Sequence, residues 1–334
     1  MSKNINLIEA NKAKKDEFYT QFEDIENELK YYKEFLKNKK ILCNCDNPFN
    51  SNFVKFFIKN FNNLKLKEIN ITCYNNGTQK AYKGKISSIP NDINDINNIK
   101  NIYTYNENIL IELQGDGSFD SLECIELLKN SDVIVTNPPF SLFRKFLNLL
   151  IENNKDFIII GNHNALTYKD VFKLFIKNKI FIGYTYPKNF IIYPEYNKNI
   201  KINKNGNYIT TFGNICWFTS FILEKTNKEL LLEKQYNEND YQKYENYDAI
   251  NINKIKDIPY DYKGIMGVPI TILDKYNPNQ FEIIMIAGGN SKCNTDPKIL
   301  KFVKYRPDKR DKGGSGIING KPVYVRIFIK NKKL

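Results

Sequence analysis

Residues 131–143 read "SDVIVTNPPFSLF", and this stretch decides the kind of fold that the chain adopts. Its first half, "DVIVT", has the apolar, β-branched character of a buried strand. Asn137-Pro138-Pro139-Phe140 follows, and its prolines end regular structure because each fixes its own φ angle and lacks a backbone N–H. A rigid polar turn at the carboxyl end of a buried strand indicates a ligand site, because open α/β sheets bind their ligands at that edge.

Strand-like and helix-like segments alternate on both sides of this stretch. Short apolar runs predict strands at 39–45, 66–75, 108–119, 132–136, 156–162, 180–186 and 214–223. Apolar residues at helical spacing predict helices at 16–36, 51–61, 121–130, 142–154 and 168–178. The apolar faces of the first two helices contain Ile25, Leu29, Tyr32, Leu36, Phe53, Phe56, Phe57 and Phe61. This alternation predicts an open α/β sheet.

Changes in composition divide the chain into four parts. Residues 1–13 are expected to form a loose arm, and residues 14–223 the domain that contains the sheet. Residues 224–256 are charged and rich in Tyr, Asn and Lys, which indicates a connecting segment that leads away from the sheet. Residues 257–334 form a β-rich region, in which Asn319-Gly320 between apolar alternations predicts a hairpin. Within the second part, residues 86–101 are low in complexity and are expected to be an inserted loop.

The composition excludes several classes of protein. The chain has 334 residues, 42% of them hydrophobic, so it can build a core of normal size in one large domain or two modest ones. It contains no apolar run of about 18 residues, so no membrane span is expected. The polar N-terminus lacks the apolar region of a secretion signal, and we therefore expect a cytoplasmic protein. With one histidine, His163, and no Cys-x-x-Cys pair among six cysteines, no metal site is expected.

The charge balance suggests a class of partner. Fifty Lys and Arg residues against 37 Asp and Glu residues give a net charge of +13. A basic balance favours a polyanionic partner such as nucleic acid. A genome that is rich in codons for Asn, Ile and Lys also produces such a balance, so the charge needs the support of a site.

The turn at Asn137 has the groups that an exocyclic amine needs in order to attack an electrophile. The Asn137 side chain and the Pro138 carbonyl are rigid acceptors for the two hydrogens of an NH₂ group, and Phe140 offers a ring for stacking. Acceptors that pull on both hydrogens favour the pyramidal, nucleophilic geometry of the transition state, and no histidine base is required. The tetrapeptide resembles motif IV, (D/N/S)-P-P-(Y/F), of the S-adenosylmethionine-dependent amino-methyltransferases. The alternative is an ordinary strand that prolines terminate.

The end of the first long strand resembles the cofactor loop of these enzymes, motif I. The segment "CDNPFNSNF" places Asp46, Pro48 and Phe49 in that loop. The usual glycines are missing, and Asn50 and Asn52 are expected to replace them, because Asn tolerates left-handed backbone better than most residues. The alternative is a strand end with a simple turn.

A segment near the N-terminus resembles motif X, which lies against the methionine end of the cofactor. In "DEFYTQ" the matching residues are Phe18, Tyr19 and Thr20. The family usually has proline where this chain has Gln21.

Two more positions correspond to cofactor contacts. In "QGDGSF", Asp116 holds the place of motif III, where a carboxylate accepts from the adenine amine of the cofactor; the alternative is a Gly-Asp-Gly turn. The second strand ends in "TCYNN" without the usual acidic ribose ligand, so Tyr74 or Asn75 takes that part.

Longer phrases narrow the resemblance. "KKDEFYTQ", "ILCNCDNPF", "TNPPFSLFRKF", "GVPITILDKYNPNQFEI" and "NGKPVYVRI" together look like the EcoRI-type adenine-specific DNA methyltransferase family, from about Lys14 to Lys330. The resemblance implies a Rossmann-like class I methyltransferase domain with a smaller β-rich target-recognition region. It also implies S-adenosyl-L-methionine as methyl donor and the N6 amine of an adenine in double-stranded DNA as acceptor.

The implied reaction has structural requirements. N6 is inaccessible inside the stacked duplex, so the adenine must be flipped out. By the resemblance, Asn137 and Pro138 accept from N6, Pro139 braces the turn, Phe140 stacks on the base, and the methyl passes by direct displacement. We expect a monomer that protects DNA beside a cognate restriction endonuclease, or a solitary modifier.

The DNA contacts are expected in the β-rich region. "KYRPDKRDKGGSG" concentrates basic residues in a flexible, glycine-rich loop that follows a backbone or enters a groove: Lys304, Arg306, Lys309, Arg310 and Lys312. The alternative is a solvated hairpin tip. The aromatic run at 186–196 lines a base-flipping path or, more ordinarily, packs in the core. Trp217 is expected in the core or in a pocket wall.

Other functions stay open at this stage. An amino-methyltransferase acting on an RNA adenine, on cytosine N4 or on a glutamine side chain uses the same tetrapeptide. A non-catalytic DNA-binding relative agrees with the altered motif I and the missing acid. A nicotinamide-binding enzyme is disfavoured, because no G-x-G-x-x-G follows the first strand.

Overall fold

The computed structural model describes residues 19–75, 80–90, 99–191, 201–202, 206 and 208–334. The chain divides into two compact units. Unit 1 falls within residues 1–165 and 180–221, and unit 2 comprises residues 166–179 and 222–334. The expected arm at 1–13 lies outside the described residues, as does half of the expected inserted loop, at 91–98.

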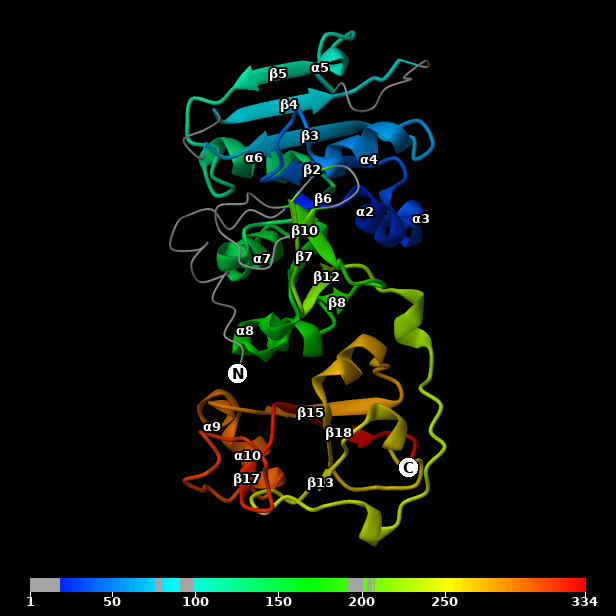
Figure 1. Ribbon diagram of the computed structural model, residues 1–334, viewed down its shortest axis with the longest axis vertical. Helices are drawn as coiled ribbons and strands as arrows, with labels where there is room; N and C mark the ends of the chain where they lie inside the picture. Colours follow the sequence, from blue (N-terminus) through cyan, green and yellow to red (C-terminus); the bar gives the residue numbers. More distant parts are fainter. Residues whose placement is uncertain (1–18, 76–79, 91–98, 192–200, 203–205, 207) are drawn as a thin grey trace. The chain divides into compact units, whose positions relative to one another are not determined.

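Unit 1 is built on an eight-stranded mixed sheet with the order β5-β4-β3-β2-β6-β7-β12-β8 (Figure 1). Its strands are β2 (Lys40–Asn44), β3 (Glu68–Cys73), β4 (Tyr82–Ile86), β5 (Ile109–Glu112), β6 (Val133–Thr136), β7 (Asp156–Asn162), β8 (Phe181–Ile182) and β12 (Ile215–Thr219). The four strands β3, β2, β6 and β7 are parallel, and antiparallel strands extend the sheet at both edges. The predicted α/β sheet is confirmed, while strand β4 was not predicted.

The helices in the described part of unit 1 are α2 (Phe22–Leu29), α3 (Lys33–Leu36), α4 (Asn52–Asn60), α5 (Ile99–Ile102), α6 (Leu122–Asn130) and α7 (Phe143–Glu152). Helix α4 joins β2 to β3 and α7 joins β6 to β7, whereas α2 and α3 precede β2, α5 lies between β4 and β5, and α6 leads into β6. Ser51 and Ser121 begin α4 and α6 as N-caps, because each hydroxyl accepts from backbone N–H groups of the first turn. The predicted apolar faces of the first two helical segments are all buried. Each fully buried Phe or Leu side chain stabilises the fold by roughly 1.5–3 kcal/mol relative to an exposed one.

The first helix begins later than the sequence predicts. Helix 16–36 was expected, but Tyr19–Thr20 forms strand β1, and α2 starts at Phe22. Strand β1 pairs with β9 (Asn189–Ile191), β9 pairs with β11 (Tyr208–Thr211), and β11 pairs with β10 (Lys201–Ile202) in a small antiparallel sheet. Backbone hydrogen bonds to a strand about 170 residues away, with Tyr19 opposite Ile191, thus override the local helical pattern.

Unit 2 contains a four-stranded sheet and a hairpin. The sheet has the order β13-β14-β18-β15, with bounds Ile250–Asn251, Met266–Pro269, Arg326–Asn331 and Phe281–Ala287. The helices are α8 (Lys169–Ile176), α9 (Ser291–Asn294) and α10 (Pro297–Phe302). The predicted hairpin is confirmed: β16 (Ile317–Ile318) pairs with β17 (Lys321–Pro322), and Asn319 and Gly320 both have positive φ, at 50° and 71°.

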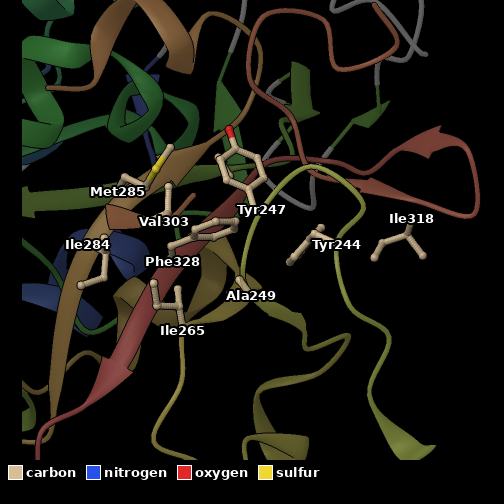
Figure 2. Packing of buried hydrophobic residues seen from close by; sticks show 10 residues of the cluster. Tyr244, Tyr247, Ala249, Ile265, Ile284, Met285, Val303, Ile318 and Phe328 are labelled. Atoms are coloured by element: carbon tan, nitrogen blue, oxygen red, sulfur yellow. The ribbon is translucent and has the colours of Figure 1, made fainter. Parts of the chain in front are cut away.

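The core of unit 2 includes residues that the sequence analysis placed in the connecting segment. Figure 2 shows Tyr244, Tyr247 and Ala249 packed with residues of β15 and β18, such as Met285 and Phe328. Tyr244 and Tyr247 are 3% and 1% exposed. Residues 224–256 therefore belong to compact unit 2 and are not a separate connecting segment. Helix α8 also belongs to unit 2, where Phe175 contacts Tyr276, although it was expected in the first domain.

Trp217 lies in the core on β12, 0% exposed, with its ring 6.0 Å from that of Phe53. Cys43, Cys73, Cys124 and Cys216 are buried and unbridged, as expected of reduced cysteines that act as small hydrophobes. In the part of the chain that the structure describes, no helix has the length and apolarity needed to span a membrane. Nor do three or more His, Cys, Asp or Glu side chains there gather as a metal site.

Candidate active site

The predicted ligand edge lies where β2 and β6 run side by side. The two strands are parallel, with Ile41 opposite Val133 and Leu42 opposite Ile134. The chain continues from β2 to β3 on one side of β2, whereas β6 lies on the other side. The boundary between β2 and β6 is therefore the point where the strand order reverses, and ligands of α/β sheets bind outside the carboxyl ends at such points.

The turn at 137–140, which we call the catalytic loop, leads from β6 into a helix. Pro139 has φ −53° and ψ 127°, and a 3-10 turn at Phe140–Leu142 follows before α7 begins. The Leu142 N–H donates to the Pro139 carbonyl at 2.9 Å. Pro138 is buried, and Asn137 and Phe140 are half-buried. Pro138 and Pro139 have no N–H groups, so these two residues have no backbone donor that needs a partner.

Thr20 in β1 joins three of the predicted motifs. The Asn137 side-chain amide donates to the Thr20 hydroxyl at 3.3 Å. The side-chain amide of Asn52, at the start of α4, donates to the Thr20 carbonyl at 2.8 Å. Thr20 is 3% exposed, and Tyr19 beside it is half-buried. The structure thus brings together the segments that resemble motifs X, I and IV, whereas Phe18 lies outside the described residues.

Phe140 belongs to an aromatic cluster that sequence spacing did not reveal. Its ring centroid lies 6.1 Å from that of Phe190 and 6.3 Å from that of Phe212, at interplanar angles of 85° and 83°. Phe190 is on β9 and Phe212 follows β11, so the small sheet supplies both partners. Within the described part of the aromatic run at 186–196, Phe190 packs in the core beside the catalytic loop, whereas Tyr186 is exposed.

In the predicted cofactor loop, residues 45–53, the residue with left-handed backbone is Cys45. Its φ is 60°, whereas neither Asn50 nor Asn52 has positive φ. The expectation that these asparagines replace the missing glycines is wrong. Ser51 holds extended backbone as the helix N-cap, and Asn52 is the first helical residue. The chain must turn directly after β2, so the strain falls on the first residue beyond the strand.

Asp46 is buried and links the loop after β2 to the N-cap of α4 and to the end of β6. Its Oδ1 accepts from the Ser51 hydroxyl at 2.7 Å, and its Oδ2 accepts from the Thr136 hydroxyl at 2.9 Å. The same Thr136 hydroxyl also lies within hydrogen-bond reach of the Asn44 carbonyl, so its one proton is shared between that oxygen and Asp46 Oδ2. Asp46 is 7% exposed, and Ser51 and Thr136 are 1% and 0% exposed. The carboxylate that resembles a motif I ligand thus already accepts from two side chains of the protein.

Pro48 and Phe49 complete the cofactor loop. The Tyr103 hydroxyl donates to the Pro48 carbonyl at 3.3 Å, and burial raises the pKa of Tyr103. The ring of Phe49 is half-buried and contacts Tyr82 edge-on at 5.5 Å. Lys100 lies over the same ring, with Nζ 5.4 Å from its centroid.

The segments at Tyr74 and Asp116 meet at the end of β3. The Asn75 N–H donates to the Asp116 carbonyl at 2.8 Å. Gly117 has φ 73°, and a Cβ there would lie 2.2 Å from the Cys73 carbonyl, so the turn requires glycine. Asp116 is exposed, and its Oδ1 accepts from the Ser118 N–H at 2.9 Å. The Tyr74 side chain is 38% exposed beside it.

Asn44 is a buried polar residue that the sequence analysis missed. It is the last residue of β2 and is 0% exposed. Both polar atoms of its side-chain amide lack a hydrogen-bond partner among the described residues. Buried amides normally have partners, so this one marks a place where a polar ligand or an ordered water can bind.

The predicted DNA-contact loop, residues 304–316, which we call the basic loop, is built around Asp311. Asp311 is 3% exposed. Its Oδ1 accepts from the N–H groups of Gly313 and Gly314 at 2.8 and 3.2 Å, and its Oδ2 accepts from the Tyr305 hydroxyl at 2.5 Å. Burial raises the pKa of Asp311, but the Tyr305 hydroxyl and the backbone amides outweigh burial and hold this pKa below its usual value.

Segment 244–248 anchors the basic loop to the core of unit 2. The Tyr247 hydroxyl donates to the Gly314 carbonyl at 2.7 Å. The Asn246 side chain donates to the Ser315 carbonyl at 2.9 Å and accepts from the Ile317 N–H at 2.9 Å. The loop joins α10 to β16, so it is not a hairpin tip, and these contacts make it an ordered turn in place of the flexible loop that its glycines suggested.

The five basic residues of this loop differ in their pairing. Lys304 pairs with Asp248 at 2.6 Å, and Arg310 pairs with Asp308 at 2.6 Å and with Glu245 at 3.0 Å. Arg306 donates to the Glu245 carbonyl at 2.8 Å. Lys309 and Lys312 are exposed, and no carboxylate in the described chain pairs with them.

Sequence reasoning missed the residues that hold the site together. Ser51 precedes an apolar run, as an N-cap does, so its capping role was detectable. Thr136 and Tyr103 carried no signal, because their partners are about 90 and 55 residues away in the chain.

Comparison with curated proteins gives full-length matches. The chain is 44% identical over 336 residues to the type II methyltransferase M.EcoRI of Escherichia coli, a match that covers 98% of this chain and 97% of the relative. It is 38% identical to the type II methyltransferase M.MgeORF184P of Mycoplasma genitalium, covering 97% of this chain and 98% of the relative. It is 36% identical to the type II methyltransferase M.MpnI of Mycoplasma pneumoniae, covering 97% of each chain. No solved structure matches the chain.

A family model gives the same result. The model described as "Adenine-specific methyltransferase EcoRI" matches residues 6–332, which is nearly the whole chain. The match includes the cofactor loop, the catalytic loop and the basic loop. The chain therefore belongs to the EcoRI family of adenine-specific methyltransferases.

Proposed function

We propose that the protein is a site-specific DNA methyltransferase that transfers a methyl group to the N6 amine of a flipped-out adenine in duplex DNA. The observation that carries the proposal is the position of Asn137-Pro138-Pro139-Phe140. This loop follows β6 at the point where the strand order reverses, directly beside the loop that follows β2. Family membership supports the adenine specificity, and the names of the relatives support a restriction–modification setting.

The order of the strands supports a Rossmann-like class I methyltransferase domain. Strands β3, β2, β6 and β7 are parallel and contain the reversal, and β12 runs antiparallel between β7 and β8. A sheet of this kind binds a nucleoside cofactor across the reversal. Unit 2, with its own sheet and basic loop, is the proposed target-recognition region.

The residues around the carboxyl ends of β2 and β3 fit S-adenosyl-L-methionine. Phe49 and Tyr74 offer aromatic rings, and the exposed carboxylate of Asp116 is an acceptor for an adenine amine. The buried Asn44 amide offers a donor and an acceptor to polar groups. Tyr19 and Thr20 border the catalytic loop, where the methionine end belongs. When bound, this cofactor supplies an electrophilic methyl group on a sulfonium.

The mechanism assigns complementary roles to the catalytic loop. The Asn137 side-chain oxygen and the Pro138 carbonyl accept the two N6 hydrogens, which localises the nitrogen lone pair for attack. Phe140 stacks on the base and holds it in the attacking orientation. With the methyl donor bound between the two loops, the N6 nitrogen would take the methyl group as the sulfonium leaves as a neutral thioether, and one N6 proton would pass to solvent. No side chain of the protein is methylated on the way.

The basic loop is the proposed DNA contact. Lys309 and Lys312 are the exposed cations of the loop that no described carboxylate pairs, so they are suited to phosphate groups. Lys304, Arg306 and Arg310 are proposed contacts that also brace the loop through their partners. We expect the enzyme to act in the cytoplasm as a monomer, beside a cognate endonuclease that recognises the same sequence.

The test is a single-turnover methylation assay with labelled cofactor on duplex DNA, followed by nucleoside mass spectrometry. N6-methyladenine is the expected product. Asn137→Ala is expected to slow transfer at least about 100-fold, the usual effect of removing one transition-state hydrogen bond. Asn63→Ala is the matched control, because Asn63 is exposed and lies after α4. N4-methylcytosine, methylated RNA or methylglutamine as product, or an Asn137→Ala variant at wild-type rate, would overturn the proposal.

A further inference from the structure

The Asp46 carboxylate connects the end of β6 to the beginning of α4. Thr136, the residue before Asn137, donates to one carboxylate oxygen at 2.9 Å, and Ser51 donates to the other at 2.7 Å. The two donors come from β6 and from the N-cap of α4. We call this arrangement the Thr136–Asp46–Ser51 bridge.

Ser51 connects Asp46 to the first turn of α4. Its oxygen accepts from the N–H groups of Phe53 and Val54 at 3.2 and 3.3 Å while its hydroxyl proton goes to Asp46. The negative charge of Asp46 therefore lies next to the positive end of α4, a favourable arrangement. The bridge fixes where the helix starts relative to the two strand ends.

All three members are nearly inaccessible to solvent, with exposed fractions of 7%, 1% and 0% for Asp46, Ser51 and Thr136. Water therefore cannot easily replace a lost hydrogen bond, so removing either donor to Asp46 is costly. Such a bridge has one well-defined geometry. The catalytic loop begins one residue after Thr136, so its position depends on that geometry.

A second link supports the same conclusion. Asn137 donates to the Thr20 hydroxyl at 3.3 Å, and Asn52 donates to the Thr20 carbonyl at 2.8 Å. Asn52 adjoins Ser51 in the chain and Asn137 adjoins Thr136. The cofactor loop and the catalytic loop are therefore joined twice, once through Asp46 and once through Thr20.

We propose that Thr136 and Asp46 are positioning residues, which place the acceptors of Asn137 and Pro138 relative to the methyl donor. This inference rests on the proposed methyltransferase function. In this proposal Asp46 does not touch the reacting atoms. It holds the two loops in place through its hydrogen bonds to Thr136 and Ser51. Misplacement of reacting groups by about 1 Å slows a reaction by as much as about 100-fold.

The test compares Thr136→Val, which keeps the shape and removes the donor, with Thr136→Ser, which keeps the donor. Single-turnover methylation is measured at saturating cofactor and DNA, and cofactor affinity by equilibrium titration. Thr136→Val is expected to be about 10- to 100-fold slower, with cofactor Kd changed less than about threefold. Thr136→Ser is expected to stay within about threefold of wild type in both.

Ser51→Ala tests the same bridge from its other end, in case Thr136→Val does not fold. Ser51→Thr, which keeps the hydroxyl, is its conservative partner. Slower transfer with nearly unchanged cofactor affinity in Ser51→Ala supports the bridge. Two results overturn the proposal: a wild-type rate in Thr136→Val, or a loss of cofactor affinity in it that saturating cofactor fully restores. A wild-type protein that methylates no adenine overturns the proposed function instead, so the two failures are distinguishable.

Discussion

The catalytic loop in unit 1 and the basic loop in unit 2 are each held by a buried aspartate, but the donors have different origins. Asp46 accepts from Thr136 and Ser51, and Thr136 lies on another strand, 90 residues away in the chain. Asp311 accepts from Tyr305, Gly313 and Gly314, all within six residues of it. Asp311 therefore closes the turn of the basic loop through near neighbours, although segment 244–248 anchors that turn to the core, whereas Asp46 ties the end of β6 to a loop 90 residues earlier in the chain.

The difference corresponds to what each loop is proposed to do. A loop that meets the phosphates of a long polyanion needs exposed charge on a stable turn. A loop that presents acceptors to one reacting amine must be placed accurately relative to a second loop, which local hydrogen bonds cannot achieve. Mutations in each loop should therefore affect different properties: stability and DNA affinity for the basic loop, and the rate of methyl transfer for the catalytic loop.

The largest effect on stability is expected from Asp311→Ala. The N–H groups of Gly313 and Gly314 and the Tyr305 hydroxyl lose their acceptor, which is expected to lower the free energy of unfolding by about 3 kcal/mol. Urea denaturation followed by circular dichroism measures it. Asp308→Ala, at a half-exposed position of the same loop, is the control and should have a much smaller effect. Equal effects of the two variants would mean that Asp311 does not organise the turn.

The next effect concerns DNA affinity. Replacing Lys309 and Lys312 together by alanine is expected to weaken DNA binding about tenfold and to reduce the slope of log Kd against log salt by about two, since each lysine neutralises one phosphate. Single-turnover rates at saturating DNA should stay near wild type, because the lysines do not touch the reacting base.

The matched control for these lysines is the pair Lys67 and Lys129. Both are exposed, and they precede β3 and β6 at the edge of the sheet opposite to the catalytic loop. Replacing them removes the same charge and is expected to leave the salt slope unchanged. A slope that falls equally in both double variants would show that only net charge matters.

A smaller effect is expected at Cys45, where the cofactor loop holds a side chain at φ 60°. Glycine adopts this backbone without a Cβ conflict, so Cys45→Gly should be more stable than Cys45→Ala by about 1 kcal/mol. Comparing the two variants by urea denaturation removes the contribution of the thiol, which both lack. A more stable alanine variant would argue against a left-handed residue at this position.

The smallest effect is a pH dependence from Asp311. The Tyr305 hydroxyl and the backbone amides outweigh burial and hold its pKa below the usual value of the unfolded chain. The unfolded chain therefore takes up the proton first, so the contribution is fully present above the unfolded pKa and is lost as the pH falls through the folded pKa. The difference in unfolding free energy between wild type and Asp311→Asn should narrow as the pH falls below about 4. A constant difference from pH 6 to 3 would contradict the lowered pKa.

Much of the fold was predictable because the central strands are nearly continuous apolar runs. Strands β2, β3, β6 and β7 and helices α4, α6 and α7 lie where the patterns placed them. The short strands β1, β9, β10 and β11 were not predicted. Each has only two to four residues and is stabilised mainly by its partner strands.

The candidate site divides in the same way. The sequence alone determined that Asn137-Pro138-Pro139-Phe140 ends a buried strand, that residues 51–61 contain a helix, and that Asn319-Gly320 turns a hairpin, because each depends on neighbours within a few residues. Only the tertiary structure decided that Cys45 takes the left-handed turn, that Thr20 meets Asn137, and that Asp46 bridges Thr136 and Ser51. Those contacts join residues up to about 117 positions apart, and no local pattern records which distant donor a buried acceptor meets.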